Sequence, residues 1–341
     1  MIPSFNDWAA LALLLPRIDR ALAGSAWRVS VLVVDDASTE PGSNDWPGGN
    51  FTTIEAVEIL HLRCNLGHQR AIALGLYQVH EFTTAAAVVV MDGDGEDRPE
   101  DLPALLAEFE RGCRREIVFA ARGKRLESWT FQFFYRAYRV IHYLLTGIAV
   151  RVGNFSVVPR ESLTRLMAVS DLWNHYAAAV YRARLPRRLL PLSRGRRLAG
   201  ESRMNFVSLL VHGLTAISVF GDQVSARLLA ASAVFTVLAA GLISVTAVIR
   251  LGTGLAAPGW VTYTIASLAI MVLQSVTFAA LLVFAAASRR NGLGFLPPRD
   301  APFFILGSTV AAGASPLARL GETLLRADVP IRPVAPAGVK A

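Results

Sequence analysis

Two long stretches without a charged residue constrain the fold of this chain more than any other feature. They cover residues 228–249 and 260–288, and each can cross about 30 Å of hydrocarbon as a helix. The ten residues between them, 250–259, contain Gly and Pro, which suits a turn between antiparallel helices. A mean hydropathy of +0.42 agrees with a membrane protein. The sequence therefore predicts a transmembrane hairpin of two helices.

Basic residues predict the orientation of this hairpin. They precede the first stretch or follow the second: Arg182, Arg184, Arg187, Arg188, Arg194, Arg196, Arg197, Arg203, Arg227, Arg289 and Arg290. Only Arg250 lies in the turn. Positive charge stays on the cytoplasmic side of a membrane span, so both ends of the hairpin are expected in the cytoplasm, at the inner membrane. The net charge of +8 is then explained by lipid headgroups rather than by nucleic acid, because the arginine cluster adjoins a span.

The termini and the cysteines fit a cytoplasmic domain. Residues 1–16 have no basic region ahead of their apolar stretch, so we do not expect a cleaved signal peptide. Cys64 and Cys113 lack the spacing of a disulfide framework or a metal site, which fits a reducing compartment.

Short apolar runs alternate with helical patterns up to about residue 125, which predicts βα units. Strands are expected at residues 29–34, 54–62, 85–91 and 117–121, and helices at 67–80, 99–110 and 129–145. The first and third of these strands end in acids, Asp35-Asp36 and Asp92. In open α/β sheets, ligands bind beyond the carboxyl ends of the strands, so these acids are candidates for a site.

The acidic cluster from Asp92 to Glu100 is the sharpest signal in the chain. Carboxylates at alternating positions after a buried strand suit Mg²⁺ or Mn²⁺, which leave open positions for substrate phosphates. An EF-hand is excluded, because its sixth and twelfth positions would be Asp97 and Pro103 rather than Gly and Glu. A solvated acidic turn that caps the helix beginning at Pro99 is the simpler alternative.

Four motifs in order carry a resemblance to a known family. They are Ile-Pro-Ser-Phe-Asn-Asp at residues 2–7, Val-Asp-Asp-Ala-Ser-Thr at 34–39, Asn-Leu-Gly at 65–67 and Asp-Gly-Asp-Gly-Glu-Asp at 92–97. Together they resemble the family 2 glycosyltransferases with a GT-A fold, within them most closely the dolichyl-phosphate mannose synthases and bacterial polyprenyl-phosphate glycosyltransferases. The motif resemblance covers about residues 1–225, and the hairpin matches in architecture.

The resemblance implies a domain layout. A GT-A catalytic domain of class α/β, with a mainly parallel sheet, would cover residues 1–200. An interfacial amphipathic helix would follow at 201–225, the hairpin at 226–290 and a cytoplasmic tail at 291–341. The apolar run at 303–310 is too short to span a membrane and has no assigned role.

The resemblance also implies donor-binding residues. Pro3, Asn6 and Asp7 would line the nucleotide pocket, Asp36 would hold the base or ribose, and Asp92 would contact the nucleotide, while Asp94 and Glu96 would bind the metal. Asn65 and Gly67 would open a helix toward phosphate, with Arg70 as charge partner. For Asn6 and Asp7 a helix N-cap before Trp8 is the alternative. His68 is expected to be a structural hydrogen-bonding residue.

Further basic and polar residues match the family's phosphate and acceptor positions. These are Arg122 and Arg125 after the next strand, and Arg194, Arg197, Ser202 and Arg203 in a stretch of the form R-x-x-R-x-x-G-x-S-R. Attraction to the membrane surface is the alternative, and it is our interpretation for Arg187 and Arg188. Asn154 replaces the acid of the family's Gly-Asp-Phe-Arg segment, and an amide cannot act as a general base. Asp97 could be the base for an acceptor that needs one.

The resemblance implies inverting transfer from a UDP- or GDP-sugar to a polyprenyl phosphate, whose oxygen can attack without a base. One alternative is transfer to a lipid or glycan hydroxyl, although the Q-x-x-R-W motif of processive enzymes is absent from the sequence. Another is a nonenzymatic membrane protein that binds nucleotide. The sequence leaves a homo-oligomer open.

Overall fold

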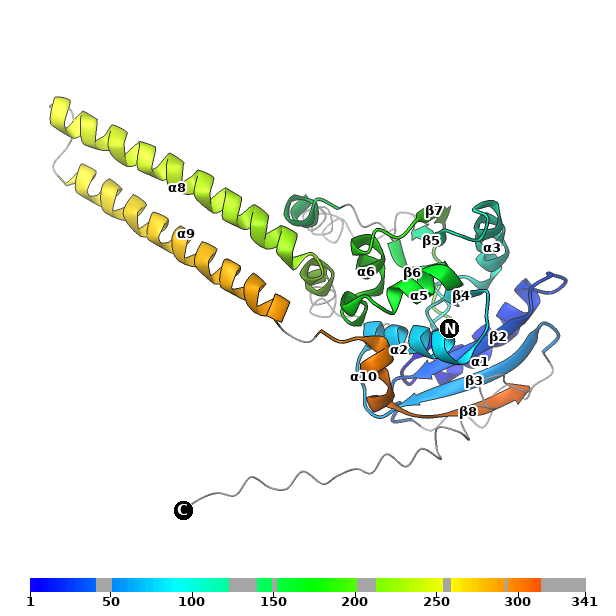
Figure 1. The fold of residues 1–341 in the computed structure, drawn as a ribbon. Coiled ribbons are helices and arrows are strands. Elements are labelled where there is room, and N and C mark those ends of the chain that lie inside the picture. The colour runs from blue at the N-terminus through cyan, green and yellow to red at the C-terminus, as the bar shows by residue number, and fades with distance from the viewer. Residues whose placement is uncertain are drawn as a thin grey trace, which may run out of the picture.

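The computed structural model describes residues 1–40, 51–122, 140–148, 152–200, 213–253, 259–291 and 294–313. These residues form an α/β domain from which two long helices project (Figure 1). The α/β domain contains two sheets of four strands each.

The first sheet holds the amino-terminal strands. Its order is β1 (Ile2–Ser4), β2 (Val29–Asp35), β3 (Ile54–Leu62) and β8 (Ile305–Gly313). The first three strands are parallel, and β8 runs antiparallel to β3. The strands expected at 29–34 and 54–62 are confirmed, and β1 has only three residues.

The second sheet has the order β4 (Ala87–Val90), β6 (Val152–Pro159), β5 (Ile117–Arg122) and β7 (Arg187–Leu192). Strand β6 is antiparallel to both of its neighbours, whereas β7 is parallel to β5. The two sheets adjoin at β1 and β4, where the Met91 amide donates to the Met1 carbonyl at 3.2 Å. Parallel and antiparallel pairs are thus mixed, because β6 and β8 enter against the direction of the βα units.

Helices cover both faces of these sheets. On one face lie α1 (Trp8–Ala21) and α3 (Leu102–Arg111), which follows the short helix η1 (Pro99–Asp101). On the other lie α2 (His68–Phe82), α5 (Arg160–Leu166) and α6 (Tyr176–Arg182). Val33 of β2 packs toward α1, and Val34 packs toward α2. Burial on both faces explains why the strands read as unbroken apolar runs.

The two projecting helices are α8 (Gly221–Gly252) and α9 (Trp260–Asn291), which lie side by side as a hairpin (Figure 1). Both are long and apolar enough to cross a membrane, and at most 6% of either apolar window is buried. A core helix of a soluble protein would bury most of that surface. In the middle of the hairpin, Ser232 Oγ donates to the Ser275 carbonyl at 2.9 Å. The two predicted apolar helices are therefore confirmed.

After the hairpin the chain returns to the α/β domain. It forms α10 (Pro297–Asp300) and η3 (Ala301–Phe303) before β8 completes the first sheet. Trp173, at the end of η2 (Ser170–Trp173), stacks on Phe295 with ring centroids 3.8 Å apart and lies 5.0 Å from the ring of Phe304. Residues 294–313 are thus part of the α/β domain rather than a separate tail, and the apolar run at 303–310 contributes to strand β8.

The assignment of Arg187 and Arg188 to the membrane surface is wrong. Both residues lie in β7, where Arg188 forms ion pairs with Glu108 and Glu116 and the Arg187 guanidinium lies 3.8 Å from the centre of the Tyr181 ring. Their charges are used within the domain. Of the expected helices at 129–145 and 201–225, residues 140–146 and 213–218 are helical, while 129–139 and 201–212 lie outside the described residues.

Candidate active site

The acidic loop, residues 92–97, follows β4 at the carboxyl ends of the strands. It folds back on itself, because the Asp92 amide donates to Asp97 Oδ2 at 3.0 Å and the Glu96 amide donates to Asp94 Oδ1 at 2.9 Å. Gly95 adopts a φ of +83°, which permits this reversal. Asp97 is only 3% exposed, so its carboxylate is placed to hold the loop.

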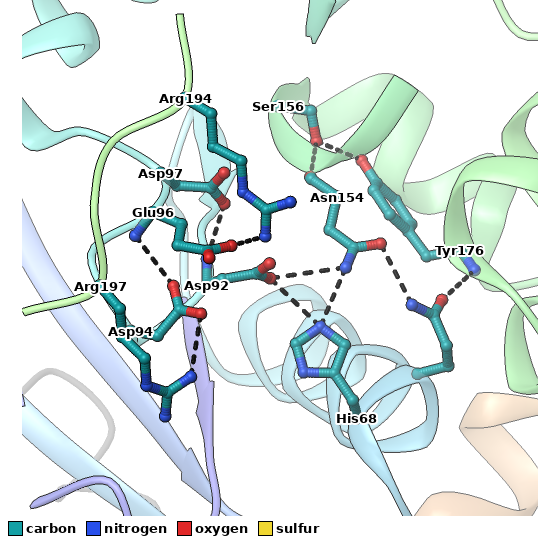
Figure 2. A network of polar contacts seen from close by, with 11 residues as sticks. His68, Asp92, Asp94, Glu96, Asp97, Asn154, Ser156, Tyr176, Arg194 and Arg197 are labelled. Atoms are coloured by element: carbon teal, nitrogen blue, oxygen red, sulfur yellow. Dashed lines mark hydrogen bonds and ion pairs between the residues drawn. The ribbon is translucent and has the colours of Figure 1, made fainter. Parts of the chain in front are cut away.

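A second segment, residues 194–198, lies against the acidic loop (Figure 2). We call it the arginine segment. Its backbone is fixed by hydrogen bonds from the Gly195 amide to the Glu96 carbonyl, 2.8 Å, and from the Leu198 amide to the Asp94 carbonyl, 2.9 Å. Its side chains then reach the predicted metal ligands, since Arg194 forms an ion pair with Glu96 and Arg197 lies 3.3 Å from Asp94.

Arg197 also joins the acidic loop to the amino-terminal strand. Its other terminal nitrogen lies 2.6 Å from Asp7 Oδ1. Asp7 occupies the N-cap position of α1 but makes no side-chain capping hydrogen bond. Its carboxylate instead forms the ion pair with Arg197. One guanidinium therefore bridges two carboxylates predicted to face the nucleotide sugar and the metal.

The site concentrates negative charge. Burial and the neighbouring Asp92 raise the pKa of Asp94, although Arg197 and Arg194 partly offset this. The side chains of Asp94 and Glu96 are 18% and 14% exposed, so both are partly open to solvent. Carboxylate oxygens on one loop fit Mg²⁺ or Mn²⁺, which need only one or two protein carboxylates when phosphates complete the coordination.

His68 and Asn154 face the other side of Asp92. His68 Nε2 lies 3.2 Å from Asp92 Oδ1 and 2.9 Å from Asn154 Nδ2 (Figure 2). Burial acts to lower the pKa of His68, but the charges of Asp92, Asp94 and Asp97 outweigh it and raise this pKa. The first turn of α2 and strand β6 thus bring a histidine and an amide to the acid that is predicted to contact the nucleotide.

The predicted nucleotide residues cluster at the ends of β1 and β2. Pro3 is buried in β1. Asn6 Oδ1 accepts from the amides of Thr39 and Glu40 at 2.8 and 3.1 Å, which ties the end of β1 to the chain after β2. The two oxygens of Asp36 accept from the Leu66 and Gly67 amides at 2.7 and 2.8 Å. Asp36 thereby fixes the backbone of residues 66 and 67, just before α2 begins.

Other predicted residues lie apart from this centre. Asn65 and Arg70 are exposed, and the Arg70 guanidinium lies 5.2 Å from the centre of the Trp173 ring. Arg122 ends β5, opposite Leu192 of β7. Arg125, Ser202 and Arg203 lie outside the described residues. Gln69 and Tyr176 were not predicted from the sequence. Gln69 donates to the Asn154 side chain, and the Tyr176 amide donates to Gln69. The only sequence signal for Gln69 is its place in the first turn of α2, and Tyr176 has none.

Comparisons with known proteins agree with this geometry. Residues 1–167 match the family model described as Glycosyl transferase family 2. The chain is 23% identical over 233 residues to an uncharacterized glycosyltransferase, YkcC, of Bacillus subtilis (strain 168), an alignment that covers 65% of this chain and 68% of that protein. It is 28% identical over 217 residues to an undecaprenyl-phosphate mannosyltransferase of Micrococcus luteus, covering 60% of this chain and 86% of the relative. Residues 1–167, which contain the acidic loop and the strands that carry it, are therefore a glycosyltransferase domain of family 2.

Proposed function

We propose that this chain is an inverting glycosyltransferase that moves a sugar from a UDP- or GDP-sugar to a polyprenyl phosphate at the cytoplasmic face of the inner membrane. The observation that carries the proposal is the pairing of Asp94 and Glu96 with Arg197 and Arg194 in a domain joined to an apolar hairpin. Carboxylates bind a cation and guanidiniums bind phosphate oxygens, so these four side chains could bind a metal ion together with a diphosphate.

Asp94 and Glu96 would hold Mg²⁺ or Mn²⁺. The residues that the structure describes contain no group of three or more His, Cys, Asp or Glu side chains arranged as a metal site, so oxygens of the diphosphate would complete the coordination. A cation bound there would neutralise charge on the departing diphosphate. Arg194 and Arg197 would then exchange their carboxylates for diphosphate oxygens, to which guanidinium groups bind in the same two-pronged geometry.

Two positions that could supply the general base, 154 and 97, favour a phosphate acceptor. In the reaction, an acceptor oxygen bonds to the anomeric carbon while the bond from that carbon to the diphosphate breaks, and its electron pair leaves with the nucleoside diphosphate. A hydroxyl acceptor must lose a proton to a base, whereas a phosphate oxygen is already anionic. Asn154 is an amide, and Asp97 is buried and accepts the Asp92 amide. Both observations favour a phosphate acceptor.

The hairpin and one relative support a lipid acceptor. A polyprenyl phosphate lies in the membrane, and α8 and α9 would anchor the domain beside it. Arg227 near the start of α8, together with Arg289 and Arg290 at the end of α9, favours a cytoplasmic α/β domain. The Micrococcus luteus relative is named as an undecaprenyl-phosphate mannosyltransferase, which acts on an acceptor of this class.

The test is transfer of radiolabelled sugar from a panel of UDP- and GDP-sugars into lipid extracted from membranes that contain the full-length protein. We expect one donor to label a polyprenyl-linked phosphodiester, EDTA to stop labelling, and Mg²⁺ or Mn²⁺ to restore it. Asp94→Asn should reduce transfer by at least about 100-fold, since it removes a charge that the reaction uses. Glu100→Gln is the matched control, because Glu100 pairs with Arg17 and is 42% exposed.

Each contrary outcome has a separate meaning. Labelled product that carries a hydroxyl linkage would replace the phosphate acceptor with a lipid or glycan hydroxyl. Binding of the nucleotide sugar with neither transfer nor hydrolysis would support a nonenzymatic role. Transfer that survives both EDTA and Asp94→Asn would refute the metal site.

A further inference from the structure

A chain of side-chain amides connects the buried core of the domain to Asp92. The Tyr176 backbone amide donates to Gln69 Oε1 at 2.8 Å, and Gln69 Nε2 donates to Asn154 Oδ1 at 3.2 Å. Asn154 Nδ2 in turn lies 2.9 Å from His68 Nε2 and 3.5 Å from Asp92 Oδ1 (Figure 2). Helix α2, strand β6 and helix α6 each contribute one member of this chain.

The direction of these hydrogen bonds is fixed from one end. A backbone N–H can only donate, whereas a side-chain amide can be turned so that either its oxygen or its nitrogen faces a neighbour. Gln69 must therefore present its oxygen to Tyr176, which leaves its nitrogen facing Asn154. Asn154 must then present its oxygen to Gln69 and its nitrogen to His68 Nε2 and Asp92 Oδ1. Turning either amide would bring two donors or two acceptors together.

The frame around Asn154 is buried and polar. Ser156 Oγ donates to the backbone carbonyl of Asn154 at 2.8 Å and lies 2.7 Å from the Tyr176 hydroxyl. Since the Ser156 hydrogen is used on the carbonyl, the phenol of Tyr176 is the donor to Ser156. Burial raises the pKa of Tyr176, so that this phenol keeps its proton. Tyr176 and Ser156 are fully buried, and Asn154 is 8% exposed, so the amide has little freedom to rotate.

We infer that Gln69 is a positioning residue, which fixes the Asn154 amide so that an N–H donor, and not a carbonyl oxygen, faces the reacting end of the site. The inference rests on the proposed function, because an anionic phosphate oxygen is the acceptor that benefits from this donor. Hydrogen bonds to an ionised oxygen are about twice as strong as those between neutral groups. The opposite orientation would place a carbonyl dipole against both Asp92 and the incoming phosphate.

Gln69→Glu tests this role with nearly unchanged shape. The introduced carboxylate still accepts from the Tyr176 amide, but an acceptor replaces the nitrogen that faced Asn154. The Asn154 amide must then turn its nitrogen toward α2 and its oxygen toward Asp92. We expect the KM for polyprenyl phosphate to rise about 10- to 100-fold, the usual cost of losing a hydrogen bond to a charged group. The KM for the nucleotide sugar and its slow hydrolysis without acceptor should change by less than about twofold, since the donor contacts remain.

Two further variants separate positioning from folding. Asn154→Asp puts an oxygen where the nitrogen stood and should produce the same increase in acceptor KM. Asp19→Ala removes the acceptor of the Thr52, Thr53 and Ile54 amides, which take no part in the amide chain. It should lower the melting temperature while leaving the acceptor KM unchanged. Should Gln69→Glu fail to fold, Gln69→Leu removes the same donor without adding charge and should raise the same KM.

The assay is sugar transfer to polyprenyl phosphate by the full-length protein in detergent micelles, with both substrates varied. If the wild type transfers sugar and Gln69→Glu keeps a normal acceptor KM, or if donor and acceptor KM rise together, Gln69 is not a positioning residue for the acceptor. The same conclusion follows if Asp19→Ala reproduces the Gln69→Glu effect. If the wild type uses no phosphate acceptor at all, the proposed function fails and this inference fails with it.

Discussion

Gly95 stands where a side chain would meet the arginine segment, so Gly95→Ala should separate that segment from the acidic loop. A Cβ at this position would lie 2.3 Å from Leu198 Cγ and 2.6 Å from Leu198 Cδ1. The backbone φ of +83° adds a separate cost, because residues with a Cβ are strained in that region. The Leu198 amide donates to the Asp94 carbonyl at 2.9 Å, so the backbone that carries this side chain is held against the acidic loop.

The loss of unfolding free energy caused by Gly95→Ala has two parts, which can be measured separately. The strain of a positive φ at a residue with a Cβ costs about 1–2 kcal/mol. Gly24→Ala measures it alone, because Gly24 has a φ of +72° and nothing lies within 4 Å of its Cβ position. Overpacking against Leu198 adds about 1–3 kcal/mol, which gives about 2–5 kcal/mol for Gly95→Ala. The double variant Gly95→Ala/Leu198→Ala should recover most of the steric part relative to Leu198→Ala alone.

The assay is thermal unfolding of the α/β domain in the detergent-solubilised chain, followed by tryptophan fluorescence, together with sugar transfer. A domain of this size loses about 2–4 °C of melting temperature per kcal/mol, so Gly95→Ala should fall clearly below Gly24→Ala. Transfer should fall with it, because Arg194 and Arg197 leave their present positions. An equal shift for both glycine variants, or no recovery in the double variant, would refute the role given to Leu198.

Three further predictions concern the rest of the molecule. Asp19 accepts hydrogen bonds from the amides of Thr52, Thr53 and Ile54, so Asp19→Ala should cost about 2–4 kcal/mol of stability at neutral pH. Burial alone would raise the pKa of Asp19, but these hydrogen bonds outweigh burial and lower the pKa. The stabilisation by Asp19 is therefore complete above the unfolded pKa of about 3.9 and is lost as pH falls through the native pKa. The melting temperatures of the wild type and Asp19→Ala should accordingly converge in acid. Trp173→Ala removes the ring that Phe295 and Phe304 contact, at a cost of about 3–5 kcal/mol, and limited proteolysis should then cut within residues 294–313, which stay protected in the wild type. Ser232→Cys with Ser275→Cys, in a background of Cys64→Ser and Cys113→Ser, should form an oxidative crosslink that is seen as a mobility shift. Ser232→Cys with Thr264→Cys should not, because Thr264 lies about 16 Å nearer the start of α9 than Ser275.

The elements that the sequence predicted share a local signal. Strands β2 and β3 are unbroken apolar or alternating runs that end at polar residues, and α2 follows a glycine with positive φ. Each pattern is complete within about ten residues, so no distant contact is needed to recognise it. The same holds for α8 and α9, whose uncharged stretches at 228–249 and 260–288 are visible without any partner.

The strands that the sequence missed depend on distant partners. Strand β7 reads Arg-Arg-Leu-Leu-Pro-Leu, and its arginines resemble a membrane-surface patch until Glu108 and Glu116 are seen beside Arg188. Strand β8 is rich in small residues and acquires its role from β3, which lies far earlier in the chain. Tertiary context decides such strands more than their own composition does.

The candidate site shows the same division. The carboxylates of the acidic loop and the arginines opposite them could be found from motifs, since their chemistry is visible in the residue types. The contact of Gln69 with the Tyr176 amide spans 107 residues and involves a backbone donor that any residue type would supply. No pattern in the sequence marks such a contact.

The return of the chain to β3 has a consequence for how the protein is made. His61 and Thr309 touch across 248 residues of sequence, with 2.9 Å between His61 Nε2 and Thr309 Oγ1. At a synthesis rate of 5–20 residues per second, β8 emerges about 12–50 s after β3, and both apolar helices are translated in that interval. The β3 edge of this sheet therefore stays open until both apolar helices and β8 have been translated. During that interval the unpaired edge is exposed to chaperones, to proteases and to pairing with other strands.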